Sequence, residues 1–163
     1  MSIFQSCPPP RGLVRAGAGI ALLAALVAGT AAPAQEAANP MPTVELGAGI
    51  HLIHAELANT DLARMRGLMF RKALEPNHGM LFVFDGADRE CMWMRNTLLP
   101  LSVAFIDDDG SIVNIEEMQP QTDDRHCAAR NVRYALEMAG GWFRSHGVHA
   151  GSVLQGVVAA GRR

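Results

Sequence analysis

The sequence lacks the short motifs that identify the common classes of enzyme. Its 163 residues contain no Gly-x-Ser-x-Gly turn, no glycine-rich phosphate loop and no paired Asp/Glu motif. Histidines stand three residues apart at His51/His54 and at His146/His149, but neither spacing matches a zinc motif on a helix. An enzyme is therefore the less favoured class of function, and neither a metal nor a cofactor is expected.

Long apolar runs and long helical periods are also missing. The most apolar stretch, near residues 16–28, is about 15 residues long and falls short of the ~20 that cross a bilayer as a helix. No window keeps a helical period, and no internal repeat occurs. These absences leave a small domain built from short elements, without a stable membrane span, as the expected architecture.

The first 34 residues have the composition of a secretory signal peptide. Arg11 and Arg15 form a basic region, an apolar run follows, and Ala32-Pro33-Ala34 has the small-x-small form of a cleavage site. Cleavage near Ala34 would leave a protein that is periplasmic or secreted. An uncleaved anchor is the alternative.

The chain that remains after cleavage is long enough for one domain with a hydrophobic core. Residues 35–42 lack periodicity and are expected to form a disordered leader into a single β domain at residues 43–160. The full chain has 14 basic and 16 acidic residues, and cleavage would remove two of the basic ones. This acidic balance disfavours nucleic acid as a partner.

Cysteine is rare, with three residues in the chain, and Cys7 lies in the expected signal peptide. Cys91 and Cys127 would remain after export, and an even pair in an exported domain is first interpreted as a disulfide. Two separate buried thiols are the alternative. A disulfide across a loop of this length would stabilise the fold by roughly 4 kcal/mol.

Short apolar runs bounded by turn residues recur about every ten residues, which is typical of a mainly antiparallel β domain. We expect short helices at Asp61–Arg66, capped by Asn59 or Thr60, and at Gly141–His146, and a hairpin turn at Asp107–Gly110. The expected strands are Thr43–Leu46, Ile50–Leu57, Met80–Phe84, Cys91–Met94, Leu101–Ile106, Ile112–Met118, Val132–Met138 and Ser152–Val158. The sequence thus predicts a mainly β fold, a compact antiparallel β-sandwich or partly closed barrel with one or two short helices.

Three polar residues, Arg95, Asn96 and Thr97, stand together between two strongly apolar runs. In a structural interpretation, Asn96 and Thr97 satisfy backbone groups at a break in the strand, and Arg95 pairs with an acid such as Asp107 or Glu137. In a functional interpretation, Arg95 grips an anionic group while Asn96 and Thr97 fix its orientation. The trio is therefore the candidate ligand-binding site.

The function that these observations favour is an exported binding or accessory module for a small anionic ligand or an extended peptide. The alternative is a hydrolase-like enzyme that uses Arg95–Thr97. A third hypothesis is a soft-metal module for copper, because seven methionines between residues 65 and 138 accompany His126, Cys91 and Cys127. The cysteines are better used in a disulfide and most of the methionines in the core, so no metal ligands are assigned.

Four blocks of sequence carry a family resemblance. They are RGLMFR at 66–71, GMLFVF at 79–84, MWMRNTLLPL at 92–101 with FIDDDGSIVNI at 105–115, and VRYALEMAGGWF at 132–143 with GVHAGSVL at 147–154. Together they resemble the domain-of-unknown-function family 192. The resemblance implies a compact, mainly β, sandwich-like domain that is often exported in bacteria, and it implies no activity. Members often carry Lys at the position of Arg95 and Asp at the position of Ser102.

Overall fold

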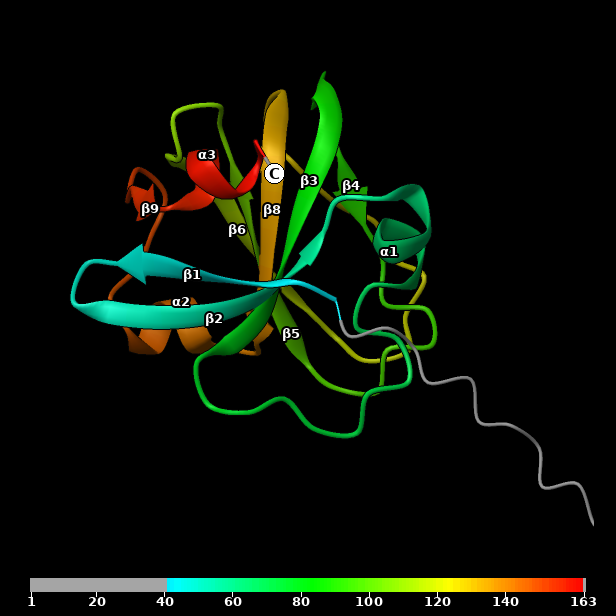
Figure 1. The fold of residues 1–163 in the computed structure, drawn as a ribbon. Helices are drawn as coiled ribbons and strands as arrows, with labels where there is room; N and C mark the ends of the chain where they lie inside the picture. Colours follow the sequence, from blue (N-terminus) through cyan, green and yellow to red (C-terminus); the bar gives the residue numbers. More distant parts are fainter. Residues whose placement is uncertain (1–40, 163) are drawn as a thin grey trace, which may run out of the picture. The chain divides into compact units, whose positions relative to one another are not determined.

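The computed structural model describes residues 41–162, which form a mainly β domain with short helices (Figure 1). The elements are β1 (Thr43–Ala48), β2 (His51–Ala58), α1 (Asp61–Arg66), β3 (His78–Asp88), β4 (Cys91–Met92), β5 (Leu101–Ile106), β6 (Ile112–Met118), β7 (His126–Cys127), β8 (Val132–Ala139), α2 (Trp142–Ser145), β9 (Leu154–Gln155) and α3 (Val157–Ala160).

The expected signal peptide at 1–34, its cleavage near Ala34 and residues 35–40 of the leader lie outside the described residues. At the start of the described chain, the carbonyl oxygen of Pro42 accepts a hydrogen bond of 2.7 Å from the amide of Leu57. Between residues 41 and 162, no helix is both long enough and apolar enough to span a bilayer.

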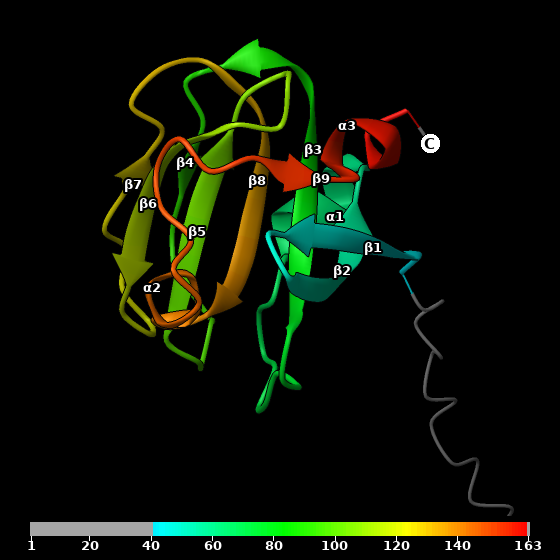
Figure 2. The ribbon, with the colours of Figure 1, turned by 90° about the vertical axis from the view of Figure 1, so that its left-hand side faces the viewer.

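Seven strands form one curled, mixed sheet in the order β6-β5-β8-β3-β2-β1-β9, and β4 pairs with β7 in a separate ribbon. Figure 2 shows β3, β5 and β8 side by side, with β1 and β2 turned across them. The sheet is a half-barrel, so the partly closed barrel is confirmed rather than the sandwich. One pairing departs from the antiparallel expectation. β2 and β3 are parallel, and residues 59–77, which include α1, form the long crossover that parallel strands require.

The central strands are apolar on both faces because both faces of the sheet are covered. All six residues of β5 are buried, and β3 and β8 are buried over most of their length. One core cluster contains Trp142 and Phe143 of α2 and Val157 of α3. The other contains Met80, Phe82 and Phe105, and Ala63 of α1 and Met92 of β4 pack against it. Continuous apolar runs are typical of strands buried in this way.

Several expected elements are confirmed to the residue, including β5, β6 and α1 with its N-cap at Thr60. The hairpin turn at Asp107–Gly110 is also present, with φ of 89° at Gly110. The prediction of one strand over Ser152–Val158 is wrong except at Leu154–Gln155. The chain is extended only in β9, and Gly156, with φ of 87°, turns it into α3.

Gly79 allows β3 and β8 to approach each other closely. A Cβ atom at this position would overlap the carbonyl oxygen of Glu137 and the sulfur of Met138. We expect Gly79→Ala to destabilise the domain by about 3 kcal/mol, at the upper end of the cost of overpacking, because strand backbone has to move. Urea unfolding of the two proteins measures the difference.

Gly86 in the same strand is the matched control, since a Cβ atom added there meets nothing within 4 Å. Gly86→Ala should leave the urea midpoint close to that of the unaltered protein. Equal midpoints for the two variants would show that the contact of β3 with β8 at Gly79 tolerates a methyl group.

Candidate functional site

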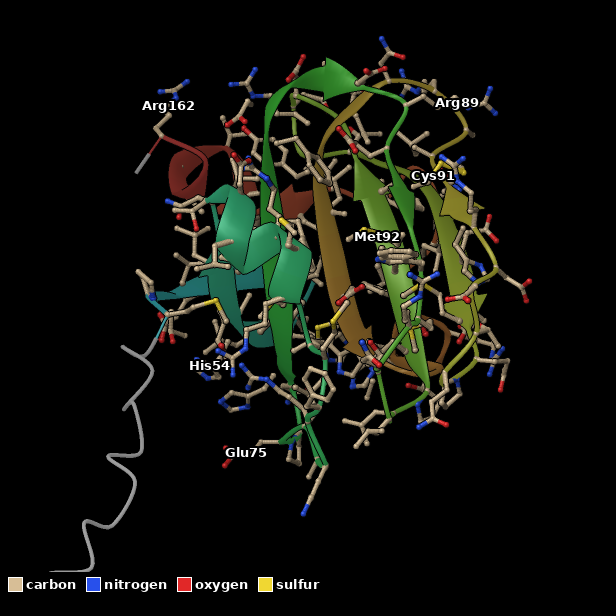
Figure 3. The ribbon with its side chains drawn as sticks, turned by 90° about the vertical axis from the view of Figure 1, so that its right-hand side faces the viewer. His54, Glu75, Arg89, Cys91, Met92 and Arg162 are labelled. Atoms are coloured by element: carbon tan, nitrogen blue, oxygen red, sulfur yellow. A yellow bond between two sulfur atoms is a disulfide. The ribbon has the colours of Figure 1, made fainter. Side chains whose placement is uncertain are left out.

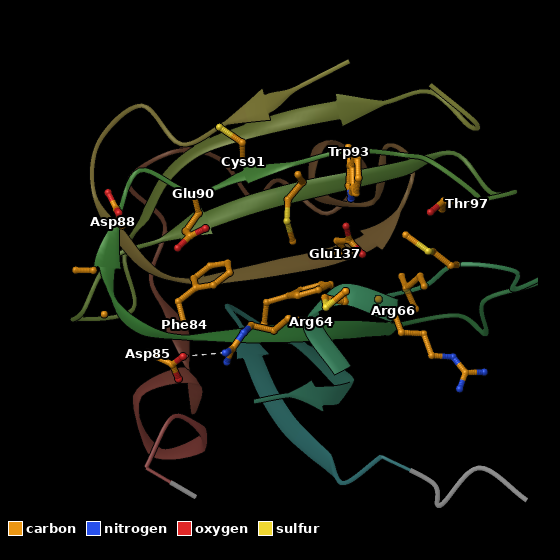
Figure 4. Close-up of a pocket in the computed structure, with 18 residues that line it drawn as sticks. Arg64, Arg66, Phe84, Asp85, Asp88, Glu90, Cys91, Trp93, Thr97 and Glu137 are labelled. Atoms are coloured by element: carbon orange, nitrogen blue, oxygen red, sulfur yellow. Dashed lines mark hydrogen bonds and ion pairs between the residues drawn. The ribbon is translucent and has the colours of Figure 1, made fainter. Parts of the chain in front are cut away.

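A cavity of about 540 Å³ lies between α1 and the β4 segment, over the central strands of the sheet (Figure 4). We call it the Glu137 cavity, after the acid at its base. It is lined by residues 64–69, Phe82, residues 84–88, residues 90–93, Thr97 and Glu137. Its walls are therefore contributed by α1 and the turn after it, by β3, and by the β4 segment that leads to Thr97.

The wall formed by α1 is attached to β3 by one arginine. Thr60 caps the helix, its hydroxyl accepting a hydrogen bond of 3.2 Å from the amide of Ala63. One guanidinium nitrogen of Arg64 donates to the carbonyl oxygen of Val83 at 2.8 Å, and another donates to Asp85 at 2.9 Å and also to Asp61. These bonds hold the helix over the strand and occupy the arginine.

The opposite wall, which contains β4, is bonded to β7 by the predicted disulfide, and the structure confirms this bond. Cys91 of β4 and Cys127 of β7 are direct partners in the ribbon, with Cα atoms 4.0 Å apart. Figure 3 shows Cys91 and Met92 on this ribbon beside the sheet. The strand β7 was not expected from the sequence, because its two residues are too short to form a pattern. The bond therefore fixes a lining residue, Cys91, to a second segment of the chain.

The turn that follows β4 is stabilised by backbone groups. The amide of Thr97 donates to the carbonyl oxygen of Met94 at 3.0 Å, and Asn96 has a left-handed φ of 60°. The carbonyl oxygen of Asn96 accepts from the amide of Phe70 at 2.9 Å, and that of Thr97 accepts from the amide of Gln121 at 3.1 Å. Thus the turn is joined to the α1 side of the cavity through Phe70.

Arg95 lies outside the lining of the Glu137 cavity and pairs with Asp123. Its Nε donates to the Asp123 carboxylate at 2.8 Å, and its guanidinium lies 4.3 Å from the centre of the Trp93 ring. The hydrogen bond raises the pKa of Arg95 and lowers that of Asp123. The expected partners were wrong, because Asp107 pairs with Arg130, and no cation of residues 41–162 pairs with Glu137. Of the candidate trio, Thr97 lines the cavity, whereas Arg95 and Asn96 do not.

Arg95→Met tests whether this cation is structural. The Arg95 side chain is 52% exposed and its partner is also exposed, so water replaces the lost pair. We expect the thermal midpoint to stay unchanged and the emission of Trp93 to change, because the ring loses its neighbour. Arg95→Lys is the control that keeps the charge. A strongly destabilised Arg95→Met protein would instead support the structural interpretation of the trio.

Glu137 is the residue that sequence reasoning missed as a site residue. It lies in the middle of β8, directly opposite Met80 of β3 and Val103 of β5, and is only 5% exposed. Among the described residues no group donates to or neutralises its carboxyl group, and burial raises the pKa of Glu137 to about 8. The available signal was a single acid between Leu136 and Met138, within the mostly apolar second half of β8.

The histidines lie outside the lining of the Glu137 cavity, and the methionines are divided between that lining and the core. The ring of His51 lies 4.6 Å from that of His146, and the ring of His54 lies 5.2 Å from that of His78. Within residues 41–162, no three His, Cys, Asp or Glu side chains form a group that could hold a metal ion. Three methionines line the cavity, namely Met65, Met69 and Met92, and four are buried in the core, namely Met80, Met94, Met118 and Met138.

Comparison with known proteins identifies relatives of the whole domain. Residues 43–156 match the DUF192 family, described as "Uncharacterized ACR". A crystal structure from Sinorhizobium meliloti 1021, named as a "putative transcription regulator", is 37% identical, with 69% of this chain and 91% of that chain covered and a TM-score of 0.65. A protein of unknown function from Novosphingobium aromaticivorans DSM 12444 is 31% identical, with 77% and 94% covered and a TM-score of 0.69. No curated protein matches the chain.

Proposed function

Because the chain belongs to the DUF192 family, whose domains are uncharacterised, we propose its function from the site alone: the domain is a binding module that holds a small ligand in the Glu137 cavity. The observation that carries this proposal is the buried carboxyl group at the base of the cavity. Burying an acid without a hydrogen-bond partner or a cation destabilises a fold by several kcal/mol. Such a group at the base of a cavity is a candidate contact for a ligand.

The position of the cavity changes the expected role of the trio. Thr97 offers a hydroxyl group to a ligand in the cavity, whereas Arg95 contacts Trp93 and so supports the cavity wall. A small anionic ligand or an extended peptide bound directly by Arg95 stays a prediction. The Glu137 cavity supports a different anchor, because the ionisable group at its base is an acid.

Two other functions receive less support. The name of the Sinorhizobium relative suggests DNA binding. DNA binding is favoured by an excess of basic residues, whereas this chain has a net charge of −2. A hydrolase-like mechanism needs a nucleophile within hydrogen-bond reach of a base. Thr97 and Glu137 line the same cavity, but in the described part of the chain no hydrogen bond joins their side chains.

The two tryptophans allow a direct test. Trp93 is 47% exposed at the cavity, and Trp142 is buried in the other core cluster. A chemically diverse set of small molecules is screened on the full chain by thermal shift. Compounds that raise the melting temperature are then titrated into Trp142→Phe, whose emission reports on Trp93, and into Trp93→Phe as the matched control.

We expect the stabilising compounds to change the emission of Trp142→Phe and to leave that of Trp93→Phe constant. Stabilising compounds that change only the emission of Trp142 would place the binding site elsewhere. A screen without any stabilising compound would contradict the proposal as a whole.

A further inference from the structure

The charges that line the Glu137 cavity are unbalanced. Six charged residues contribute to the lining: Arg64, Arg66, Asp85, Asp88, Glu90 and Glu137. Arg64 is already bonded to Asp61, Asp85 and the carbonyl oxygen of Val83. In Figure 4 the guanidinium of Arg66 points away from Glu137. Within the described chain neither arginine is therefore paired with Glu90 or Glu137, although the charge of Arg64 partly offsets the rise in the pKa of Glu90.

Two of those acids, Glu90 and Glu137, face the cavity from different sides (Figure 4). Neither accepts a hydrogen bond or an ion pair from the residues that the structure describes, and Glu137 is almost fully buried. Burial raises the pKa of both, and the charge of Asp88 raises that of Glu90 further. The base and one side of the cavity thus present carboxyl groups that are free of protein partners within the described chain and available to a bound donor or cation.

Apart from Thr97, the remaining lining is mostly apolar or aromatic. Phe82 and Phe84 of β3 and Leu68 after α1 are buried, and Trp93 forms part of the opposite wall. Aromatic rings attract a cation over their faces and also favour apolar groups. The lining therefore suits a ligand whose charged end is small and whose body is apolar.

From this arrangement, and resting on the proposed binding function, we infer that the cavity takes an organic ammonium ion: a primary amine whose nitrogen contacts the Glu137 carboxylate and whose apolar body lies between Trp93, Phe82 and Phe84. A free alkylamine and the side chain of a lysine in a peptide share this chemistry. A carboxylate or phosphate ligand would be repelled by Asp88 and Glu90 and is therefore disfavoured.

Binding of an ammonium ion to Glu137 is coupled to the release of a proton. In the empty cavity Glu137 holds a proton below pH 8, because burial raises its pKa to about 8. An ammonium ion binds the ionised carboxylate, so binding must release that proton. The affinity should therefore rise about tenfold per pH unit from pH 6 to pH 8 and level off above. The other titratable or charged groups that face the cavity are Arg64 and Arg66 from the α1 side, Asp85 and Asp88 of β3, and Glu90 before β4.

A neutral ligand would behave in the opposite way. It would accept a hydrogen bond from the neutral Glu137 carboxyl group. Its affinity would therefore stay constant below pH 8 and fall above pH 8. The pH dependence consequently separates the two ligand classes even where both bind in the same cavity.

Isothermal titration calorimetry on the full chain tests the inference with matched six-carbon probes. The probes are n-hexylamine, hexanol and hexanoate, with Nα-acetyl-lysine methylamide as the peptide-like source of the same ammonium group. Titrations at pH 6, 7, 8 and 9, each in two buffers of different ionisation enthalpy, give the affinity and the protons released. Glu137→Gln should weaken hexylamine binding at pH 8 at least about 30-fold, the loss expected when one member of a buried charge pair is removed.

Asp124→Asn, which removes an exposed acid away from the cavity, should bind hexylamine as the unaltered protein does. Tighter binding of the lysine derivative than of hexylamine would assign the site to peptides, and the reverse would assign it to free amines. If hexanol or hexanoate changes Trp93 emission and neither amine does, the ligand class is wrong while the binding function stands. If no probe binds and the wider screen also finds nothing at Trp93, both proposals fail.

Discussion

Replacing Glu137 by glutamine should stabilise the protein by about 5 kcal/mol at pH 9 and leave its stability at pH 4 nearly unchanged. The pKa of this acid is 4.5 in an unfolded chain and about 8 in the folded domain, where burial disfavours its charge. At about 1.4 kcal/mol per pKa unit, that difference gives the expected magnitude. Glutamine has nearly the same shape and no charge, so it removes the penalty.

The direction of the pH dependence follows from proton counts. Between pH 4.5 and 8 the folded state keeps a proton on Glu137 that the unfolded state has lost, so the folded state loses stability as the pH rises through this range. Below pH 4.5 both states are protonated, and above pH 8 both are ionised. The gap between Glu137→Gln and the unaltered protein should therefore grow from pH 4.5 to pH 8 and then stay constant.

Guanidinium unfolding at pH 4, 6, 8 and 9 measures this gap. Asp124→Asn is the control, because this exposed acid should change the stability little at any of the four values. A gap that is the same at all pH values, or a variant that is less stable than the parent at pH 9, would show that Glu137 has a partner that stabilises its charge.

Reduction of the bond between Cys91 and Cys127 should lower the free energy of unfolding by roughly 4 kcal/mol. The bond closes a sequence separation of 36 residues, and in the chain-entropy model a loop of that size restricts the unfolded chain by this amount. Because β4 pairs with β7 in a two-stranded ribbon apart from the main sheet, reduction should also loosen the cavity wall that carries Met92 and Trp93.

Unfolding with and without reductant measures the effect, and the double variant Cys91→Ala/Cys127→Ala is the control. The variant should be as unstable as the reduced protein and indifferent to reductant. Thiol titration of the denatured, unreduced protein should find neither cysteine of this pair free. Identical unfolding curves for oxidised and reduced protein would contradict the predicted contribution of the loop.

The parts of the fold that could be predicted are those whose signals are local. β5 and β6 lie on either side of a turn of acidic residues and Gly110, and α1 is bounded by Thr60 and Gly67. The end of β9 depends instead on a distant element. Gly156 lies so close to β1 that a Cβ atom there would be 2.9 Å from the carbonyl oxygen of Glu45, and no local pattern contains that contact.

The candidate site was predictable only in part, because it too depends on contacts between elements that are distant in the sequence. The polar trio was visible because it interrupts apolar runs, and Thr97 does reach the cavity. The importance of Glu137 depends on β8 lying between β3 and β5, with apolar partners on both sides. Strand order is a property of the whole sheet. A lone acid in an apolar strand therefore signals a site only once its neighbouring strands are known.

The place of β8 in the sheet also sets the order in which the domain can be completed during synthesis. β8 is the strand that joins β5 and β6 to the half of the sheet that contains β1, β2 and β3, and it comes late in the chain. Until it emerges, each half has an unpaired apolar edge, the kind of surface on which partly folded chains aggregate. A chain truncated before Val132 would lack the strand that joins the halves and also the acid at the base of the cavity.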